Sequence, residues 1–358
     1  MKLENLLNYT QPTKYIVSDE FYDDSYKTPV LTAGKTFILG YTNDEDGIYK
    51  ASKSPIILFD DFTTDTKWVD FDFKVKSSAC KILTLKNANS VEDLKYIYYA
   101  MMNIRFDASQ HMRYWISKYS QCEIAYPEKS KRFYIVRALD SISQIILRER
   151  QHLKLLDELI KSRFNELFGD PLLNEYCFEI KELSKLAPFN SVKNAMVVNN
   201  NTWLLNLDMI ESDTGRIIEK IRTSEIGDST IEFDTTCVLY SKLRPYLNKV
   251  VIPDENGIGT SELISMRCDS KIITREYLTY SLRHKSFVNY INSKTGGAKM
   301  PRTSMNELRS FKMPIPPLEL QEGFSSFVNL IDKLKFNVQQ RIEKYKELLN
   351  KKMSEYFN

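Results

Sequence analysis

The sequence predicts an α+β fold in which one unit occurs twice: a mixed α/β domain followed by a long helix, then a second domain and a second helix. Two stretches, 128–169 and 317–358, carry apolar residues at alternating steps of four and three. An offset of 189 residues lays the first stretch over the second. Pairs related by this offset include Pro127 and Pro316, Arg113 and Arg302, and Gln151 and Gln340. A long internal repeat defines the architecture before any single element is assigned.

The apolar stripes predict helices that pack along another helix, because a spacing of about 3.5 residues held this long is typical of a coiled coil. Each stretch is about 40 residues, which gives a helix about 60 Å long. The first stripe consists of Ile135, Leu139, Ile142, Ile146, Leu153, Leu156, Ile160 and Leu167. The second consists of Phe324, Val328, Ile331, Val338, Ile342, Tyr345, Leu349 and Tyr356. Glu149, Arg163, Lys335 and Lys352 interrupt the rhythm. The alternative is two unrelated domains joined by ordinary helices.

The two predicted domains, 1–127 and 170–316, present similar elements in the same order. In the first we expect a buried strand at 56–59, a half-exposed strand at 68–75, a third strand at 80–85 and a helix that starts at Ser90. In the second we expect strands at 237–240 and 263–266, and a helix that starts near Thr274. Each domain ends just before a proline, a residue that suits the first turn of a helix.

Composition excludes several classes of protein. The chain is 42% hydrophobic and 27% charged, and its net charge of +3 means that any nucleic-acid surface must be local. The five cysteines lack a C-x-x-C spacing, which indicates a reducing cytoplasm with neither disulfides nor a zinc site. We find no signal peptide and no apolar run long enough to span a membrane, and therefore expect a cytoplasmic protein.

Catalytic motifs are absent. The segment 33–36 looks like the end of a phosphate-binding loop, but the glycine that such a loop needs at position 29 is Pro29. We therefore predict no catalytic residue, no metal and no cofactor in this chain. An alternative remains open. A metal-dependent nuclease could use the acidic cluster of Asp60, Asp61, Asp65, Asp70 and Asp72, although a solvated strand face is the simpler interpretation.

Two basic clusters are suited to DNA. The segment 283–312 holds seven Lys or Arg residues and one acid, Glu307. Within it, 294–302 contains two glycines flanked by cations, which lets backbone N–H groups and positive charge approach phosphate. The second cluster, at 242–249, follows a predicted strand and could place Arg244 in the major groove, where its fork matches guanine.

Several segments resemble the specificity subunits of type I restriction–modification systems. They are Met313–Gln321 after the Gly-Gly turn, Tyr240–Lys249, Gly259–Glu262, Phe59–Lys67 and Val75–Ala79. The resemblance covers essentially the whole chain, including its repeat. At the first helix start the residues are Ala125-Tyr126-Pro127-Glu128, which departs from the double proline at Pro316-Pro317.

The resemblance implies a non-catalytic subunit with two target-recognition domains, 1–127 and 170–316, each reading half of a split DNA target. It also implies that the helices 128–169 and 317–358 pack antiparallel, set the spacer and dock two methyltransferase subunits. Restriction/translocase subunits would join through these. S-adenosylmethionine, ATP and Mg²⁺ would belong to the partner subunits. Because the two domains differ in sequence, we expect an asymmetric target. A scaffold that binds only proteins is the further alternative.

Candidate DNA-binding residues lie in both domains. In the first they are Lys35, Thr63, Thr64, Lys67 and Arg113. In the second they are Lys242, Arg244, Tyr246, Lys249, Ser261, Lys294, Gly296, Gly297, Lys299 and Arg302. The first domain is acidic, so a DNA-facing surface there requires cations such as Lys35, Lys67, Lys74 and Lys76 to share one face, away from the aspartates.

Overall fold

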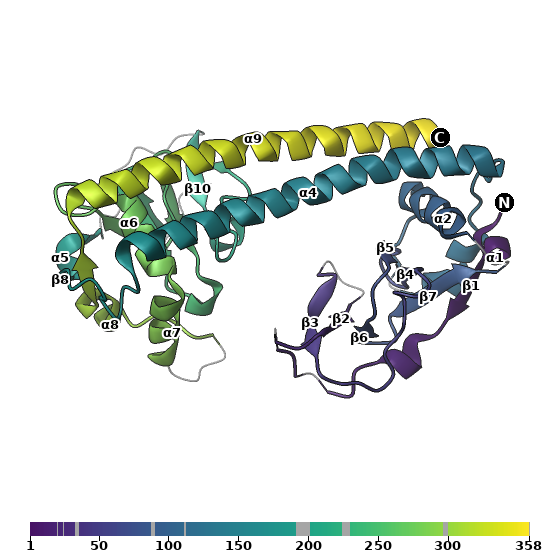
Figure 1. The fold of residues 1–358 in the computed structure, drawn as a ribbon, viewed down its shortest axis with the longest axis horizontal. Helices are drawn as coiled ribbons and strands as arrows, with labels where there is room; N and C mark the ends of the chain where they lie inside the picture. Colours follow the sequence, from purple (N-terminus) through teal and green to yellow (C-terminus); the bar gives the residue numbers. More distant parts are fainter. Residues whose placement is uncertain are drawn as a thin grey trace. The chain divides into compact units, whose positions relative to one another are not determined.

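The computed structural model describes residues 1–19, 21–23, 25–32, 36–86, 90–110, 112–190, 201–223, 230–295 and 300–357. It contains two β-rich domains and two long helices, which confirms the predicted α+β class (Figure 1). The chain forms two compact units, Met1–Glu149 with Arg341–Asn358, and Arg150–Gln340. Each unit therefore holds one mixed α/β domain together with part of both long helices.

In the first unit an antiparallel sheet has the strand order β1-β7-β4-β5. Its strands are β1 (Leu7–Thr10), β7 (Cys80–Leu85), β4 (Ile56–Asp60) and β5 (Thr66–Val69). Both faces of β4 are buried: Ile57 and Phe59 pack toward α2 (Val91–Asn103), whereas Ile56 and Leu58 pack toward Phe73 and Val75. Burial on both faces explains the unbroken apolar run in this strand.

The remaining elements of the first unit complete the domain. A smaller sheet has the order β3-β2-β6, with β3 (Ile38–Thr42), β2 (Thr28–Leu31) and β6 (Lys74–Val75). The short helices are α1 (Leu3–Leu6), η1 (Pro12–Tyr15), α3 (Tyr114–Ser117) and η2 (Tyr119–Gln121). Helix α2 begins as predicted, because the Ser90 side chain accepts a hydrogen bond from the Asp93 N–H.

The single strand predicted at 68–75 is wrong. The chain turns at Asp70–Asp72, where Asp70 accepts a hydrogen bond from the Trp68 indole (3.2 Å) and Asp72 is held by Ser52 and Lys50. β5 pairs antiparallel with β4, whereas β6 pairs parallel with β2 in the other sheet. Alternation of apolar and polar residues continues through this turn, so pattern alone does not reveal the break.

The second unit repeats much of this topology. One sheet has the order β14-β13-β16-β9, with β14 (Val250–Val251), β13 (Cys237–Ser241), β16 (Leu263–Arg267) and β9 (Phe189–Asn190). Another has the order β11-β10-β15-β12, with β11 (Ile221–Thr223), β10 (Thr202–Leu205), β15 (Gly257–Thr260) and β12 (Thr230–Phe233). β10 pairs antiparallel with β11 and parallel with β15, as β2 does with β3 and β6.

A two-stranded sheet and several helices complete the second unit. The sheet pairs β8 (Glu179–Glu182) with β17 (Lys312–Ile315). The helices are α5 (Leu183–Leu186), η3 (Leu207–Met209), η4 (Pro245–Leu247), α6 (Arg275–Arg283), α7 (Lys285–Ser293) and α8 (Met305–Ser310). Thr274 caps α6 by accepting from the Tyr277 N–H, so the helix starts where the sequence predicted.

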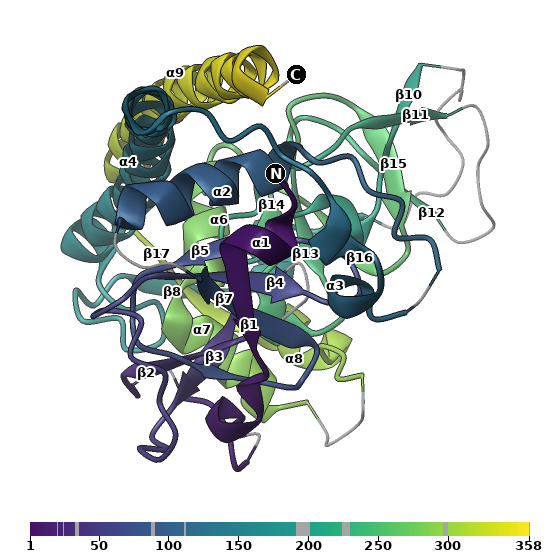
Figure 2. The ribbon, with the colours of Figure 1, turned by 90° about the vertical axis from the view of Figure 1, so that its right-hand side faces the viewer.

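The long helices α4 (Lys129–Phe168) and α9 (Leu318–Phe357) lie side by side (Figure 1; Figure 2). Contacts fall in reverse order along the two helices, so they are antiparallel: Phe164 meets Phe324, Asp157 pairs with Lys335, Glu149 with Arg341, and Tyr134 meets Tyr356. Two residues that interrupt the apolar rhythm, Glu149 and Lys335, thus take part in ion pairs between the helices (2.8 and 2.7 Å).

The buried stripe of α4 ends differently from the prediction. Its last buried apolar residues are Phe164 and Phe168, whereas Leu167 is only partly buried. Arg163 pairs with Glu166 on the exposed side instead (2.8 Å). Among the helices of the described residues, none has the combination of length and apolar character that a membrane span requires.

Candidate nucleic-acid interface

In the second unit, three separate segments meet just after β13. The Lys242 N–H donates to the Glu262 carbonyl (2.9 Å), and the Lys242 carbonyl accepts from the Thr303 N–H (2.8 Å). The Arg244 N–H donates to the Pro301 carbonyl (2.8 Å). These bonds bring the loop 242–248, which we call the interface loop, beside the turn that contains Ser261 and beside Arg302. Residues predicted from three parts of the sequence therefore lie together.

The backbone of the interface loop directs two of the predicted side chains outward. Arg244 and Asn248 adopt left-handed conformations, each with φ of 50°, on either side of η4. Such angles cost conformational energy for residues with a Cβ atom and persist only where neighbouring contacts impose them. The Arg244 and Tyr246 side chains of this loop are exposed. Across the described residues, no carboxylate forms an ion pair with Lys242 or Arg244.

Arg302 is exposed but oriented. Its Nη2 donates to Glu262 Oε1 (2.7 Å), and its backbone pairs with Leu243. Lys294 caps the C-terminal end of α7 and is exposed, with its ammonium 5.7 Å from the centre of the Tyr290 ring. The sequence did not identify Glu262 as an orienting partner, because the two residues are far apart in the chain. Gly296, Gly297 and Lys299 lie outside the described residues.

Lys249 differs from the other predicted residues. Its ammonium donates to the Leu207 carbonyl (2.6 Å), which ties the residue just before β14 to η3. Partial burial lowers the pKa of Lys249, with Asp208 acting in the opposite direction. The Lys249 ammonium is thus engaged in a contact inside the domain, and its role at DNA stays a prediction.

The first unit has a matching arrangement after β4. The Asp61 N–H donates to the Ala79 carbonyl and the Tyr114 N–H donates to the Asp61 carbonyl (both 2.9 Å). Asp61 thus occupies the position of Lys242, and Arg113 that of Arg302. Arg113 is exposed, with Nη2 3.4 Å from the Ser78 hydroxyl. We call residues 61–65 the interface turn.

The predicted residues at the interface turn form hydrogen bonds and an ion pair close to the turn, and some of their side chains are also exposed. Asp60 closes the turn by accepting from the Thr63 hydroxyl (2.6 Å) and from the Phe62 N–H (2.8 Å). Thr64 is left-handed, with φ of 63°. Thr63 is exposed, and Lys67 follows on β5 with its ammonium 4.0 Å from Asp65. Lys35 lies outside the described residues.

The aspartates of the first unit serve separate structural contacts. Asp61 is buried, pairs with the buried Lys81 (2.8 Å) and accepts from the Trp115 N–H (2.8 Å). The Ser52 hydroxyl, followed by Lys50, holds the pKa of Asp72 below its usual value. In the part of the chain that the structure describes, no three His, Cys, Asp or Glu side chains gather as a possible metal site. The nuclease alternative therefore has no supporting geometry in these residues.

Lys74 corrects the expectation of a cationic face in the first domain. Its side chain is buried and pairs with Asp44 (2.6 Å), so it offers no charge to a ligand. The Lys74 hydrogen bond, more than any other contact, lowers the pKa of Asp44 to about 2. Lys76 lies 6.0 Å from the centre of the Tyr22 ring.

Comparison with known proteins gives consistent matches. Residues 236–345 match the type I restriction modification DNA specificity domain. The chain is 32% identical to the EcoR124I/EcoR124II specificity subunit of Escherichia coli over 391 aligned positions, covering 99% of this chain and 92% of that protein. It is 22% identical to the EcoDI specificity subunit of E. coli, covering 55% and 52%. The fold is similar to the solved type I S subunit of M. genitalium, with a TM-score of 0.53, 14% identity, and coverage of 100% and 95%.

Proposed function

Because the chain belongs to the specificity subunits of type I restriction–modification systems, which are non-catalytic and recognise DNA targets, we propose that it reads a bipartite, asymmetric sequence. In this proposal 1–127 and 170–316 are the target-recognition domains. The helices 128–169 and 317–358 set the unread spacer and dock two methyltransferase subunits, through which restriction/translocase subunits join. The chain needs no cofactor of its own, and the predicted cytoplasmic location is part of the proposal.

One observation supports an asymmetric target above all. Asp61 of the interface turn and Lys242 of the interface loop make the same backbone hydrogen bonds. The exposed side chains around them differ, however: Thr63 and Arg113 in the first unit, and Arg244, Tyr246 and Arg302 in the second. Sequence is read by side chains at base edges, whereas backbone placement only positions them. Two domains of one design with different exposed side chains are therefore suited to different half-sites.

Mapping of methylated positions tests the proposal directly. A host that carries the complete system with this subunit should acquire methylation at one split, non-palindromic sequence, and this methylation should be absent without the subunit. Arg244→Ala should weaken DNA binding by the assembled complex while the fold and the assembly persist. Lys271→Ala, which removes an exposed lysine between β16 and α6, is the matched control. Wild-type methylation rates in Arg244→Ala would reject this assignment.

The proposed spacer function has its own test. Insertion of one heptad into both long helices lengthens each by about 10 Å. We expect a longer spacer between two unchanged half-sites, because the recognition domains themselves are not altered. Sequencing of methylated sites would give the new target. An unaltered spacer in a complex that still methylates DNA would show that helix length does not set this distance.

A further inference from the structure

Each long helix is bonded to the preceding domain at its first turn. In the first unit, the Tyr96 hydroxyl of α2 donates to the Ala125 carbonyl (2.8 Å), two residues before Pro127. Arg132 of α4 donates through Nε to Asp93 (2.8 Å) and through Nη1 to the Pro127 carbonyl. One tyrosine and one side chain of the long helix thus connect the domain to the helix start.

The second unit repeats these contacts with different chemistry. The Tyr277 hydroxyl of α6 donates to the Pro314 carbonyl (2.8 Å), two residues before Pro316. Gln321 of α9 donates to the Pro316 carbonyl (2.8 Å) and accepts from the Thr274 N–H (2.9 Å). Arg132 and Gln321 are related by the same offset of 189 that relates Pro127 to Pro316. An arginine in an ion pair joins the helix start to the preceding domain in the first unit, and a glutamine amide does so in the second.

We call Tyr96, Arg132, Tyr277 and Gln321 with their partners the helix-start contacts. Tyr96 and Gln321 are fully buried and Tyr277 is nearly so. Hydrogen bonds made away from water are hard to replace, since a buried donor or acceptor left unpaired costs more than an exposed one. These contacts therefore hold the domain and the helix start in one orientation.

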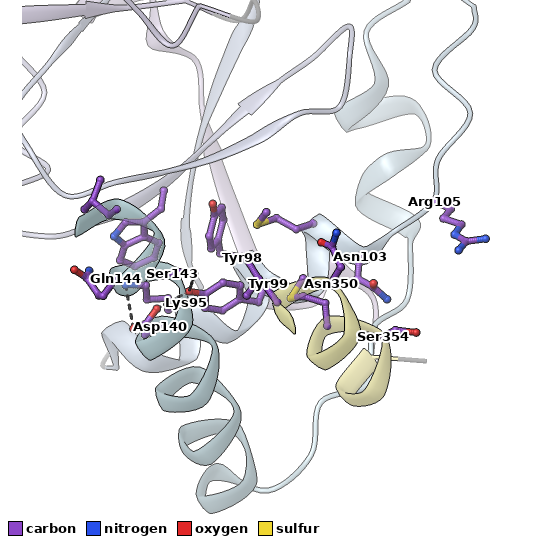
Figure 3. Close-up of a pocket in the computed structure, with 15 residues that line it drawn as sticks. Lys95, Tyr98, Tyr99, Asn103, Arg105, Asp140, Ser143, Gln144, Asn350 and Ser354 are labelled. Carbon is purple, nitrogen blue, oxygen red and sulfur yellow. Dashed lines mark hydrogen bonds and ion pairs between the residues drawn. The ribbon is translucent and has the colours of Figure 1, made fainter. Parts of the chain in front are cut away.

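The first unit adds a second link between α2 and α4. Lys95 and Tyr99 both point to Asp140 of α4, with distances of 3.1 Å for the ion pair and 2.6 Å for the hydrogen bond (Figure 3). These residues line a pocket of about 460 Å³ beside the helices, together with Trp68, Tyr98 and Met353. The link lies beyond the first turn of α4, and it restrains the same joint.

We propose that the helix-start contacts are positioning devices: they fix each recognition domain on its long helix and thereby determine how strictly the complex measures its spacer. This inference rests on the proposed function, in which helix length sets the spacer. A domain of this size has a radius of gyration of about 13 Å, so its far side lies roughly 30 Å from the joint. A pivot of only about 7° then moves that side by one base-pair step of about 3.4 Å.

Tyr96→Phe in the complete complex tests the inference, because it removes one hydroxyl and keeps the ring. The readout is methylation of DNA in which the mapped half-sites are kept and the spacer is made one base pair shorter or longer. Relative to the native spacer, methylation at altered spacers should rise roughly fivefold, the factor that corresponds to one ordinary hydrogen bond. Gln321→Met tests the joint of the second unit in the same way.

Tyr119→Phe is the matched control. The Tyr119 hydroxyl is also buried and donates to a carbonyl, that of Met101 (3.2 Å), but this bond lies inside the first domain. Loss of this hydroxyl should lower the thermal midpoint as much as Tyr96→Phe does. It should leave methylation at altered spacers, relative to the native spacer, unchanged.

The outcomes separate the inference from the proposed function. Relaxed spacing in Tyr96→Phe and Gln321→Met, with strict spacing in Tyr119→Phe, supports the inference. Strict spacing in all folded variants, or equal relaxation in the control, overturns it while the proposed function stands. A wild-type complex that methylates several spacer lengths contradicts the proposed function itself, and the inference with it.

Discussion

The interface turn of the first unit and the interface loop of the second unit carry opposite charges on equivalent backbone. Asp61 and Lys242 make the same two main-chain bonds, to Ala79 and Tyr114 in one unit and to Glu262 and Thr303 in the other. Asp61 points inward to a buried lysine, whereas Lys242 has no carboxylate partner in the described ranges. The fold fixes where this position lies, and the neighbouring strand decides which way its side chain turns.

That neighbouring strand carries a different kind of residue at the equivalent register position. Lys81 of β7 lies opposite Phe59 of β4, and Ile264 of β16 lies opposite Tyr240 of β13. A buried lysine requires a charged partner beneath the turn, because an unpaired buried ion is costly. An isoleucine requires none, so the equivalent residue of the second unit is available for a ligand. The comparison teaches that a shared scaffold can assign one position to stability and leave its counterpart for the DNA recognition that we propose.

The largest expected effect comes from making the first unit resemble the second at this position. Asp61→Lys would bury two cations together and remove the ion pair, at a cost of about 3–5 kcal/mol or more. That approaches the whole stability of an ordinary domain. We expect the first unit to unfold or aggregate, as measured by chemical denaturation. The reverse change, Lys242→Asp, should alter stability by only about 0.5 kcal/mol or less.

A double variant sharpens the interpretation. Asp61→Leu together with Lys81→Met replaces both ions by apolar side chains and should restore most of the lost stability. If Asp61→Lys alone kept the unfolding free energy of the wild type, position 61 would contribute no more to stability than position 242 does.

An intermediate effect is expected where the two units present equivalent arginines. Arg302 is oriented by Glu262 (2.7 Å), whereas within the described residues the hydrogen bond of the Arg113 side chain is a longer one, to the Ser78 hydroxyl (3.4 Å). An oriented arginine that reads guanine contributes about 1–3 kcal/mol of discrimination. Arg302→Ala should therefore lower affinity for the mapped target roughly tenfold and relax one base position. Arg113→Ala should lower DNA affinity less. It should also reduce the slope of log affinity against log salt concentration by about one, the value for one phosphate contact.

Binding of the assembled complex at several salt concentrations, to native and singly substituted targets, measures both variants. An equal loss of DNA affinity in Arg113→Ala and Arg302→Ala, with base preference unchanged, would contradict the expectation that the two arginines act differently.

The smallest expected effect concerns the long helices, where the units do not differ in kind. Glu149 pairs with Arg341 in the first unit, and Asp157 with Lys335 in the second, so α4 supplies the acid both times. Glu149→Arg would oppose Arg341 and should lower the thermal midpoint only slightly, because the pair is partly exposed and screened by solvent. Glu149→Arg with Arg341→Glu should recover that loss. The thermal midpoints of the wild type, the single variant and the double variant measure this effect. A double variant no more stable than the single variant would show that the pair does not contribute to stability.

The sequence by itself determined the duplicated architecture, the two long helices and the caps at Ser90 and Thr274. Apolar spacing and capping are relations between neighbours in the chain, so they can be read without coordinates. The resemblance to the family likewise lies in contiguous segments such as 313–321.

Only the tertiary structure decided which charges are available to a ligand. Lys74 and Lys249 look like surface cations in the sequence, yet one pairs with Asp44 in the interior and the other bonds to the Leu207 carbonyl. The partners lie about 30 to 40 positions away along the chain. The same is true of Arg302 and Glu262, which are separated by 40 positions. The direction of a long charged side chain is set by such distant contacts, and local pattern carries no information about them.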